Sequence, residues 1–143
     1  MAKMKAILVA ADGSENSDRA VKHALAMMEA GLAVELHFLN VQPNLRGATS
    51  SFVGKEDIDA YHREEGHKAL ASAVALAKAA AVTAHVHIGV GRQGEVVADF
   101  VKKLHAAQVV MGTRGHTGIA GVLLGSVAQD VIGEVDVPVT LVK

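Results

Sequence analysis

The sequence of 143 residues lacks cysteine, has no tryptophan and contains only two prolines. Without cysteine the chain can form no disulfide, no thiolate metal site and no cysteine nucleophile. Aromatic residues make up 3% of the chain, so a core has to be built from Ala, Val, Leu, Ile and Met. Hydrophobic residues still reach 50% against 20% charged ones, which is typical of a globular protein. The length suits a single domain, residues 1–143.

An excess of charge and a long hydrophobic run are missing as well. Fourteen Lys and Arg residues against fifteen Asp and Glu residues give a net charge of -1. Because a nucleic-acid partner requires a surplus of basic side chains, we do not expect one. No segment approaches the ~18 apolar residues of a membrane span, and the apolar run 6–11 is too short for the core of a signal peptide. We therefore expect a cytoplasmic protein that does not bind a membrane.

What the sequence does contain is a regular alternation of short apolar runs and amphipathic stretches. The expected strands are residues 6–10, 34–41, 84–88, 109–111 and 137–142. The expected helices are 14–30 (with Ser14 or Asn16 as the cap), 57–81, 95–105 and 126–134. This order predicts an α/β domain with a five-stranded parallel sheet and helices on both faces. Since the first and fourth strands carry no charge and the third alternates, we expect the strand order 3-2-1-4-5.

The expected strand order brings two loops together. The winding reverses between the first and fourth strands, and open α/β sheets bind ligands beyond the carboxyl ends of the strands at such a point. One loop there is residues 12–14, and the other is 112–125, where five of fourteen residues are glycine. Glycine lets backbone N–H groups approach a ligand, and the following helix start adds donors and partial positive charge. These features predict a phosphate cradle, with a tightly packed flexible loop as the alternative.

Three side chains of this segment are candidates for the cradle. Ser126 is expected to offer its hydroxyl at the cap position of the last helix. Arg114 and His116 are expected either to contact phosphate or to point to solvent. No lysine precedes Ser126, so the segment is not the P-loop of a nucleoside triphosphatase.

Other patterns point to weaker hypotheses. Gly89, Gly91 and Gly94 match the dinucleotide pattern G-x-G-x-x-G, and Arg114 follows about 20 residues on, where it would suit a 2′-phosphate. A turn followed by a helix start is the favoured interpretation of the three glycines. The chain has no G-x-S-x-G nucleophile elbow. Eight histidines include the pair His85 and His87 on one strand face, but we expect solvated side chains and no metal site.

The glycine spacing resembles a known signature. Gly112, Gly115, Gly125 and Ser126 meet G-x2-G-x9-G-[ST], which resembles the ATP-binding signature of the universal stress protein family. Residues 7–14, 109–115, 125–128 and 137–139 are also similar to sequences of this family, so the resemblance covers the whole chain. It implies a Rossmann-like (adenine nucleotide alpha hydrolase-like) domain that binds ATP, pairs as a homodimer through its last strand, and acts in regulation or stress protection. Mg²⁺ or Mn²⁺ could bridge the phosphates.

The resemblance also implies which residues bind the nucleotide. By position they are Ala11, Asp12, Val41, Met111, Gly112, Arg114, Gly115, Gly125, Ser126 and Val127. Asp12 and Val41 would hold the adenosine half, the residues from 111 to 115 the ribose and phosphates, and residues 125–127 the phosphates. The chain departs from the family at Ala107, where an Asp is common, and at Ala128, where some members offer a hydroxyl.

Three alternatives stay open at this point. Asp12 could do no more than cap the first helix. The chain could be an enzyme of slow ATP hydrolysis or phosphotransfer, although no lysine or general base is placed for turnover. It could also be an interaction protein without a nucleotide, working through dimerisation along residues 137–142.

Overall fold

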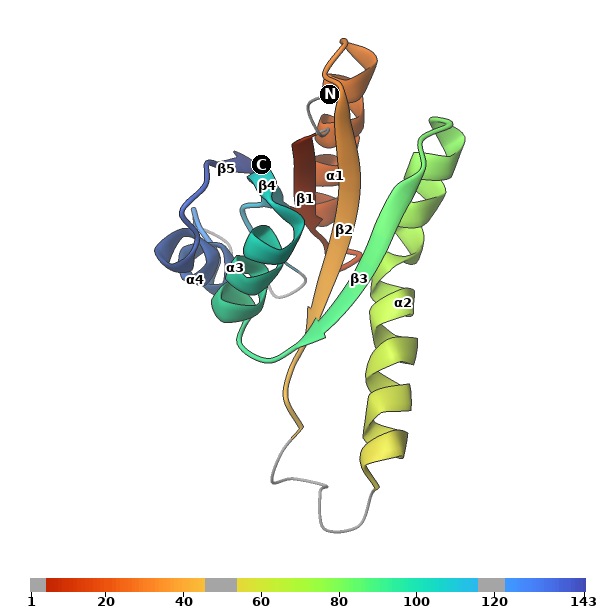
Figure 1. Cartoon of the computed structure of the whole chain (residues 1–143), viewed down its shortest axis with the longest axis vertical. Helices are drawn as coiled ribbons and strands as arrows, with labels where there is room; N and C mark the ends of the chain where they lie inside the picture. Colours follow the sequence, from red (N-terminus) through yellow and green to blue (C-terminus); the bar gives the residue numbers. More distant parts are fainter. Residues whose placement is uncertain (1–4, 46–53, 116–122) are drawn as a thin grey trace.

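A computed structural model of the chain describes residues 5–45, 54–115 and 123–143. Its five strands run parallel in one sheet in the order β3-β2-β1-β4-β5, which confirms the prediction (Figure 1). The strands are β1 (Lys5–Ala10), β2 (Val34–Gln42), β3 (Ala84–Val90), β4 (Ala106–Gly112) and β5 (Val139–Val142). The helices are α1 (Glu15–Glu29), α2 (Lys55–Ala79), α3 (Gln93–Leu104) and α4 (Ser126–Glu134). His116 lies outside the described residues, as does part of the glycine-rich loop predicted over 112–125.

Each predicted element is present, and the differences lie at the ends. The prediction that the fourth strand begins at Val109 is wrong, because β4 begins at Ala106 directly after α3. His105 ends α3 with a φ of 52°, and this left-handed residue reverses the chain within one position. β5 begins at Val139 rather than 137, yet the carbonyl of Pro138 still accepts from the Val109 N–H at 3.0 Å.

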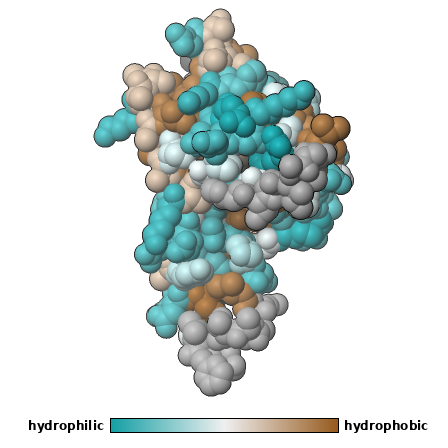
Figure 2. All heavy atoms as spheres, turned by 180° about the vertical axis from the view of Figure 1, so that it is seen from behind, coloured by the Kyte–Doolittle hydropathy of each residue, from teal (hydrophilic) through white to brown (hydrophobic). Residues whose placement is uncertain are grey.

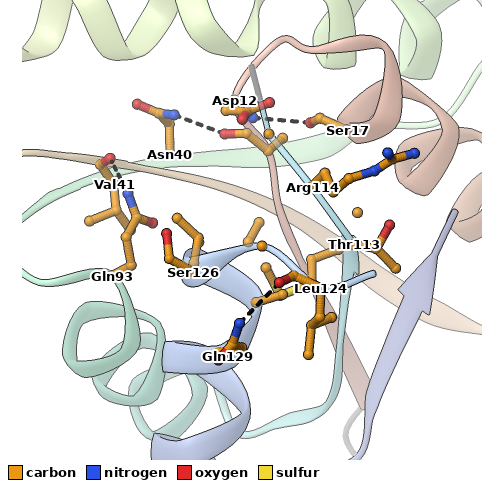
Figure 3. Close-up of a pocket in the computed structure, with 18 of the residues that line it drawn as sticks. Asp12, Ser17, Asn40, Val41, Gln93, Thr113, Arg114, Leu124, Ser126 and Gln129 are labelled. Carbon is orange, nitrogen blue, oxygen red and sulfur yellow. Dashed lines mark hydrogen bonds between the residues drawn. The ribbon is translucent and has the colours of Figure 1, made fainter. Parts of the chain in front are cut away.

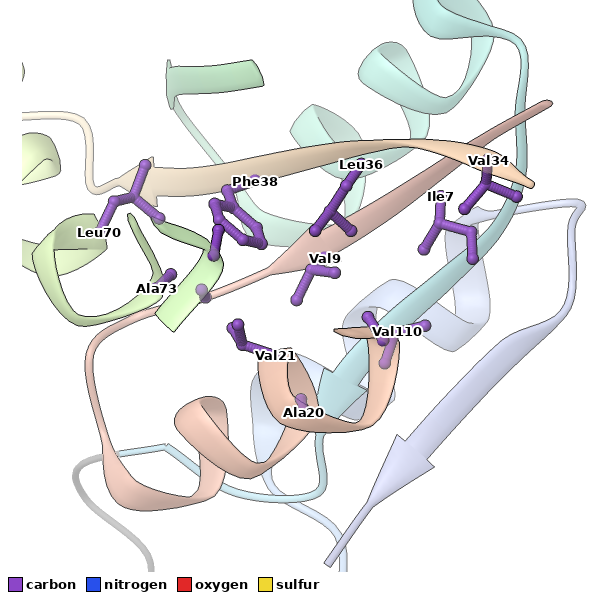
Figure 4. Close-up of a cluster of buried hydrophobic side chains, with 13 residues drawn as sticks. Ile7, Val9, Ala20, Val21, Val34, Leu36, Phe38, Leu70, Ala73 and Val110 are labelled. Carbon is purple, nitrogen blue, oxygen red and sulfur yellow. The ribbon is translucent and has the colours of Figure 1, made fainter. Parts of the chain in front are cut away.

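One face of the sheet is covered by α1 and α2. Alternate residues of the central strands, such as Ile7 and Phe38, meet Val21 of α1 and Leu70 of α2 there (Figure 4). All four side chains are fully buried. The chain has only three phenylalanines, so small side chains fill much of this layer. Because Ala20, Ala24, Ala73 and Ala77 are small, the helices can approach the sheet closely.

The opposite face is covered by α3 and α4. Leu8, which lies between two residues of the first face, packs there with Val97, Val109 and Val131. Both faces of β1 and β4 are therefore buried, which explains why these strands are continuous apolar runs in the sequence.

α2 is the longest of the described helices, and it runs roughly along the long axis of the molecule (Figure 1). The first turns of α2, drawn in yellow, extend beyond the carboxyl ends of β2 and β3. Seen from behind, much of the surface is hydrophilic, and the hydrophobic patches are separate (Figure 2). Among the helices of the described ranges, none combines the length and apolar character needed to cross a membrane.

Candidate functional site

A pocket of about 530 Å³ opens at the carboxyl ends of β1 and β4, between α1 and α4 (Figure 3). This is the point at which the winding of the sheet reverses. All ten residues named from the family resemblance line it. The structure adds lining residues that the sequence interpretation did not name, which are Ala10, Ser17, Leu39, Asn40, Gln93, Thr113, Leu124 and Gln129. Ala128, named above as a departure from the family, also lines the pocket.

The loop after β1 forms the first wall, and it is tied down by short-range hydrogen bonds. Asp12 donates its N–H to Ser17 Oγ at 3.0 Å and accepts from the Ser14 N–H through Oδ1 at 2.9 Å. Ser14 caps α1, since its Oγ accepts from the Ser17 N–H at 3.1 Å. Gly13 between them has a φ of 83°, which favours glycine. Asp12 therefore serves the start of α1 and also faces the pocket.

The end of β2 forms the second wall. Asn40, which is buried, donates through Nδ2 to the Ala11 carbonyl at 2.8 Å and joins this wall to the first one. Gln93 at the start of α3 donates to the Val41 carbonyl at 3.1 Å. Val41 is one of the residues that the family resemblance assigns to the adenosine half, and Gln93 takes one lone pair of its carbonyl. Asn40 could have been noticed as a polar residue in an apolar strand, whereas no local signal marks Gln93.

The third wall comes from the end of β4 and the residue before α4. Two of its main-chain amides form hydrogen bonds within the protein. The Gly125 N–H donates to the Thr113 carbonyl at 2.7 Å, and the Arg114 N–H donates to Asn16 Oδ1 at 2.7 Å. These bonds shape the loop and leave ligand binding to other groups.

The start of α4 supplies the donors that remain. Gly125 is its N-cap and makes no side-chain capping bond, so the prediction of Ser126 as the cap is wrong by one position. The first-turn N–H groups of Ser126, Val127 and Ala128 have no acceptor within the helix, because the first intrahelical bond runs from Gln129 to Gly125 at 3.1 Å. All three residues line the pocket, and the Ser126 hydroxyl points into it (Figure 3). An anionic group is the natural ligand of such a helix end.

Charge at the pocket comes from two side chains of opposite sign. Asp12 is half-buried, and Arg114 is exposed and extends from the third wall toward α1 (Figure 3). Among the described residues that line the pocket, no other carboxylate and no lysine is present. The arrangement can therefore accept a ligand with both hydroxyl donors and an anionic part.

The three glycines of the dinucleotide-like pattern have another role. Gly91 has a φ of 140° and turns the chain into α3, whose Gly94 N–H donates to Asp130 Oδ2 of α4 at 2.8 Å. Arg92 pairs with Asp130 and Glu134, and its hydrogen bonds to Glu134 and Glu95 raise the pKa of its guanidinium. A carboxylate of the protein thus lies where a phosphate would have to bind, and the pattern marks a turn and a helix start.

The prediction that the histidines are solvated is wrong for two of them. His37 on β2 is 6% exposed, and His62 on α2 is 5% exposed. His62 Nε2 lies 3.1 Å from the Pro43 carbonyl. His37 lies against His85 and His87, whose shared strand face is confirmed.

Comparisons with known proteins agree with this fold. Residues 3–143 match the sequence profile of the universal stress protein family. The universal stress protein MJ0531 of Methanocaldococcus jannaschii is 34% identical over 145 residues, covering 97% of this chain and 82% of that protein. The solved structure of the hypothetical protein MJ0577 has a TM-score of 0.81 and 25% identity, covering 99% of this chain and 97% of the other. A universal stress protein solved in complex with cAMP has a TM-score of 0.71 and 25% identity, covering 99% of each chain.

Proposed function

This chain belongs to the universal stress protein family, and from that premise we propose that it binds an adenine nucleotide, ATP, in the pocket between β1 and β4. In this proposal the bound nucleotide makes the chain a regulatory or stress-response module. The class of ligand is supported by the solved family member at 25% identity that holds cAMP.

One observation carries the proposal. Ten residues implied by the family signature come from three separate stretches of the chain, and all of them line one pocket of about 530 Å³. That volume lies in the usual range of about 300–1,000 Å³ for small-molecule sites. Their meeting is a property of the strand order, since they lie at or beyond the carboxyl ends of three different strands, β1, β2 and β4.

The walls suggest how the nucleotide would lie. Val41 and Leu39 give an apolar surface for the base, and Asp12 can accept from ribose hydroxyls beside Gly115. The phosphates would then meet the N–H groups at the start of α4 that have no acceptor within the helix, where the helix dipole favours negative charge. The guanidinium of Arg114 can add a charged contact to the same phosphates.

A divalent ion would depend on Asp12. It is the one carboxylate among the described residues of the pocket, and Mg²⁺ or Mn²⁺ prefers oxygen ligands. Because Asp12 Oδ1 already accepts from Ser14, the ion would share this side chain and take its other ligands from phosphate oxygens and water. The ion's contribution would be to neutralise phosphate charge.

The test is a change at Gly115. A Cβ there would lie 2.7 Å from Asp12 Oδ2, so Gly115→Val should close the pocket at the carboxylate. We expect ATP to raise the melting temperature of the wild type and to bind Gly115→Val about tenfold or more weakly in calorimetry. Gly133→Ala is the matched control, because a Cβ at Gly133 meets nothing within 4 Å. A wild type that shows no shift at millimolar ATP would contradict the proposal.

Slow ATP hydrolysis is the enzymatic alternative. It predicts steady-state phosphate release that rises in proportion to protein concentration and disappears in Asp12→Ala. Binding without such release would favour the regulatory role.

We also propose that the chain forms a homodimer through β5, which lies at the edge of the sheet. The Pro138 carbonyl accepts from β4, and the two ends of a trans peptide point in opposite directions, so the Val139 N–H points away from the sheet. Val139→Pro removes this outward donor and keeps the bond to β4. Sedimentation should give a dimer for the wild type and for Val139→Ala, and a monomer for Val139→Pro. A monomeric wild type would refute the pairing.

A further inference from the structure

Three histidines and a glutamate meet on β2 and β3, away from the nucleotide pocket. His37 and His85 are register partners across the two strands, and side chains alternate along a strand. Glu35 and His87, two residues away on their own strands, therefore lie on the same face. This is the face that carries α3, because the ring of His87 lies 5.3 Å from the ring of Phe100. The cluster is defined by Glu35, His37, His85 and His87.

The donor atoms of three of these residues are spaced like the ligands of one ion. Glu35 Oε1 lies 3.2 Å from His37 Nε2 and 3.9 Å from His85 Nε2. All three ligand atoms lie within 4.8 Å of one another. Around a tetrahedral ion with bonds of about 2.0–2.2 Å, neighbouring ligand atoms are about 3.3–3.6 Å apart. Small side-chain rotations at Glu35 and His85 would therefore complete the arrangement.

Of the three residues, His37 is buried, whereas Glu35 and His85 are accessible to solvent. The His37 side chain is 8% exposed, whereas those of Glu35 and His85 are 39% and 55% exposed. An ion could enter from solvent on the side of Glu35 and His85, and water could occupy a fourth position.

His87 holds His37 in the orientation that ligation requires. His37 Nδ1 lies 2.9 Å from His87 Nε2. When the His37 Nδ1–H donates this bond, Nε2 is left without a proton and faces Glu35 and His85. Ligating histidines are commonly oriented in this way through their second ring nitrogen.

We propose that Glu35, His37 and His85 bind a divalent first-row transition-metal ion, with Zn²⁺ as the best match, and that His87 is a positioning residue. Two imidazoles and one carboxylate suit Zn²⁺, whereas Mg²⁺ and Ca²⁺ prefer oxygen ligands alone. The site is separate from the proposed nucleotide site. Glu35, His37, His85 and His87 are not among the residues that line the pocket, and Glu35 lies four positions, about 13 Å of extended chain, before Leu39, which does line it.

The experiment uses the full chain without an affinity tag and without nucleotide. Calorimetric titration with ZnCl₂ at slightly alkaline pH, where histidine is neutral, should show one ion per chain. Both His85→Gln and Glu35→Gln should lower the affinity by about tenfold or more, since each removes one of three protein ligands. His23→Gln is the matched control, because His23 is an exposed histidine on another element, α1. The His23→Gln variant should bind Zn²⁺ with the affinity of the wild type.

A second measurement needs no variant. In NMR spectra of the wild type, Zn²⁺ should shift the ring signals of His37 and His85 and leave those of His23 and His67 in place. No saturable binding below about 1 mM Zn²⁺ would overturn the proposal. It would also be overturned by equal losses of affinity in His85→Gln and His23→Gln, or by ring shifts that spare His37 and His85.

Discussion

At the scale of single residues, the pocket depends on positions that lack a side chain. A Cβ at Gly112 would lie 2.6 Å from Asn16 Oδ1, and one at Gly125 would lie 3.2 Å from the Thr113 carbonyl. Both contacts are between parts of the protein itself. The glycine spacing therefore has a packing cause that exists without any ligand, and close packing and ligand approach are compatible explanations of the same residues.

A titrating residue of the histidine cluster makes stability depend on pH. Burial, followed by the nearby His37 and His85, lowers the pKa of His87 below its ordinary value of 6.5. The unfolded chain then takes up a proton at a higher pH than the folded chain does, so the free energy of unfolding should fall as pH drops below about 6.5. Urea denaturation of the metal-free protein between about pH 5 and 8 should show this slope, and His87→Gln should reduce it. An unchanged slope in His87→Gln would refute the assignment.

At the scale of elements, one side chain of α1 joins three segments. Asn16 is buried, donates through Nδ2 to the Val142 carbonyl of β5 at 2.8 Å, and accepts the Arg114 N–H at 2.7 Å. The sequence offered Asn16 as a possible helix cap, a role that Ser14 takes. Asn16 instead connects the start of α1 to the loop after β4 and to the edge strand.

Removal of this connection should destabilise the fold. Asn16→Ala removes the acceptor of the Arg114 N–H and one of the two donors to the Val142 carbonyl, which keeps its bond from the Thr113 N–H. A buried polar group that loses its hydrogen bond costs about 1–3 kcal/mol. We expect the free energy of unfolding to fall by about 2 kcal/mol or more in urea denaturation. Lys22→Ala, an exposed change on the same helix, should stay within about 0.5 kcal/mol of the wild type. A loss of similar size in Lys22→Ala would show that the effect does not come from the hydrogen bonds.

At the scale of the whole molecule, one sheet separates two apolar layers. The layer under α1 and α2 includes Ile7, and the layer under α3 and α4 includes Val97. Because both layers are built on the same strands, neither can unfold and leave the sheet intact, so the described fold should unfold as one cooperative unit.

This arrangement predicts additive losses within one transition. Ile7→Val should cost about 0.5–1.5 kcal/mol and Val97→Ala about 2 kcal/mol, from lost burial and the cavity left behind. Since the sheet lies between the two positions, the double variant should lose the sum to within about 0.5 kcal/mol. Fluorescence is limited by the absence of tryptophan, so urea denaturation followed by circular dichroism is the measurement. Two separate transitions in any of these variants would contradict the single unit.

The order of strands could be predicted from local patterns, and the ten residues around the pocket were named from the family resemblance. Uniform apolar runs such as 6–10 mark strands buried on both faces, and the glycines from Gly112 to Gly125 mark a loop that needs space. Their spacing along the chain also carries the family signature. These patterns locate the pocket, and the nucleotide that we propose for it rests on the family comparison.

What the sequence by itself determined, then, is the α/β fold, the parallel sheet order and the place where the loops converge. Only the tertiary structure decided how individual polar groups are used. In the folded chain the Arg114 and Gly125 amides form internal hydrogen bonds, and Asn16 donates to β5. His37 lies opposite His85 across two strands. The physical reason is that a hydrogen bond requires both partners within about 3 Å, and partners up to 126 residues apart along the chain are chosen by packing rather than by local sequence.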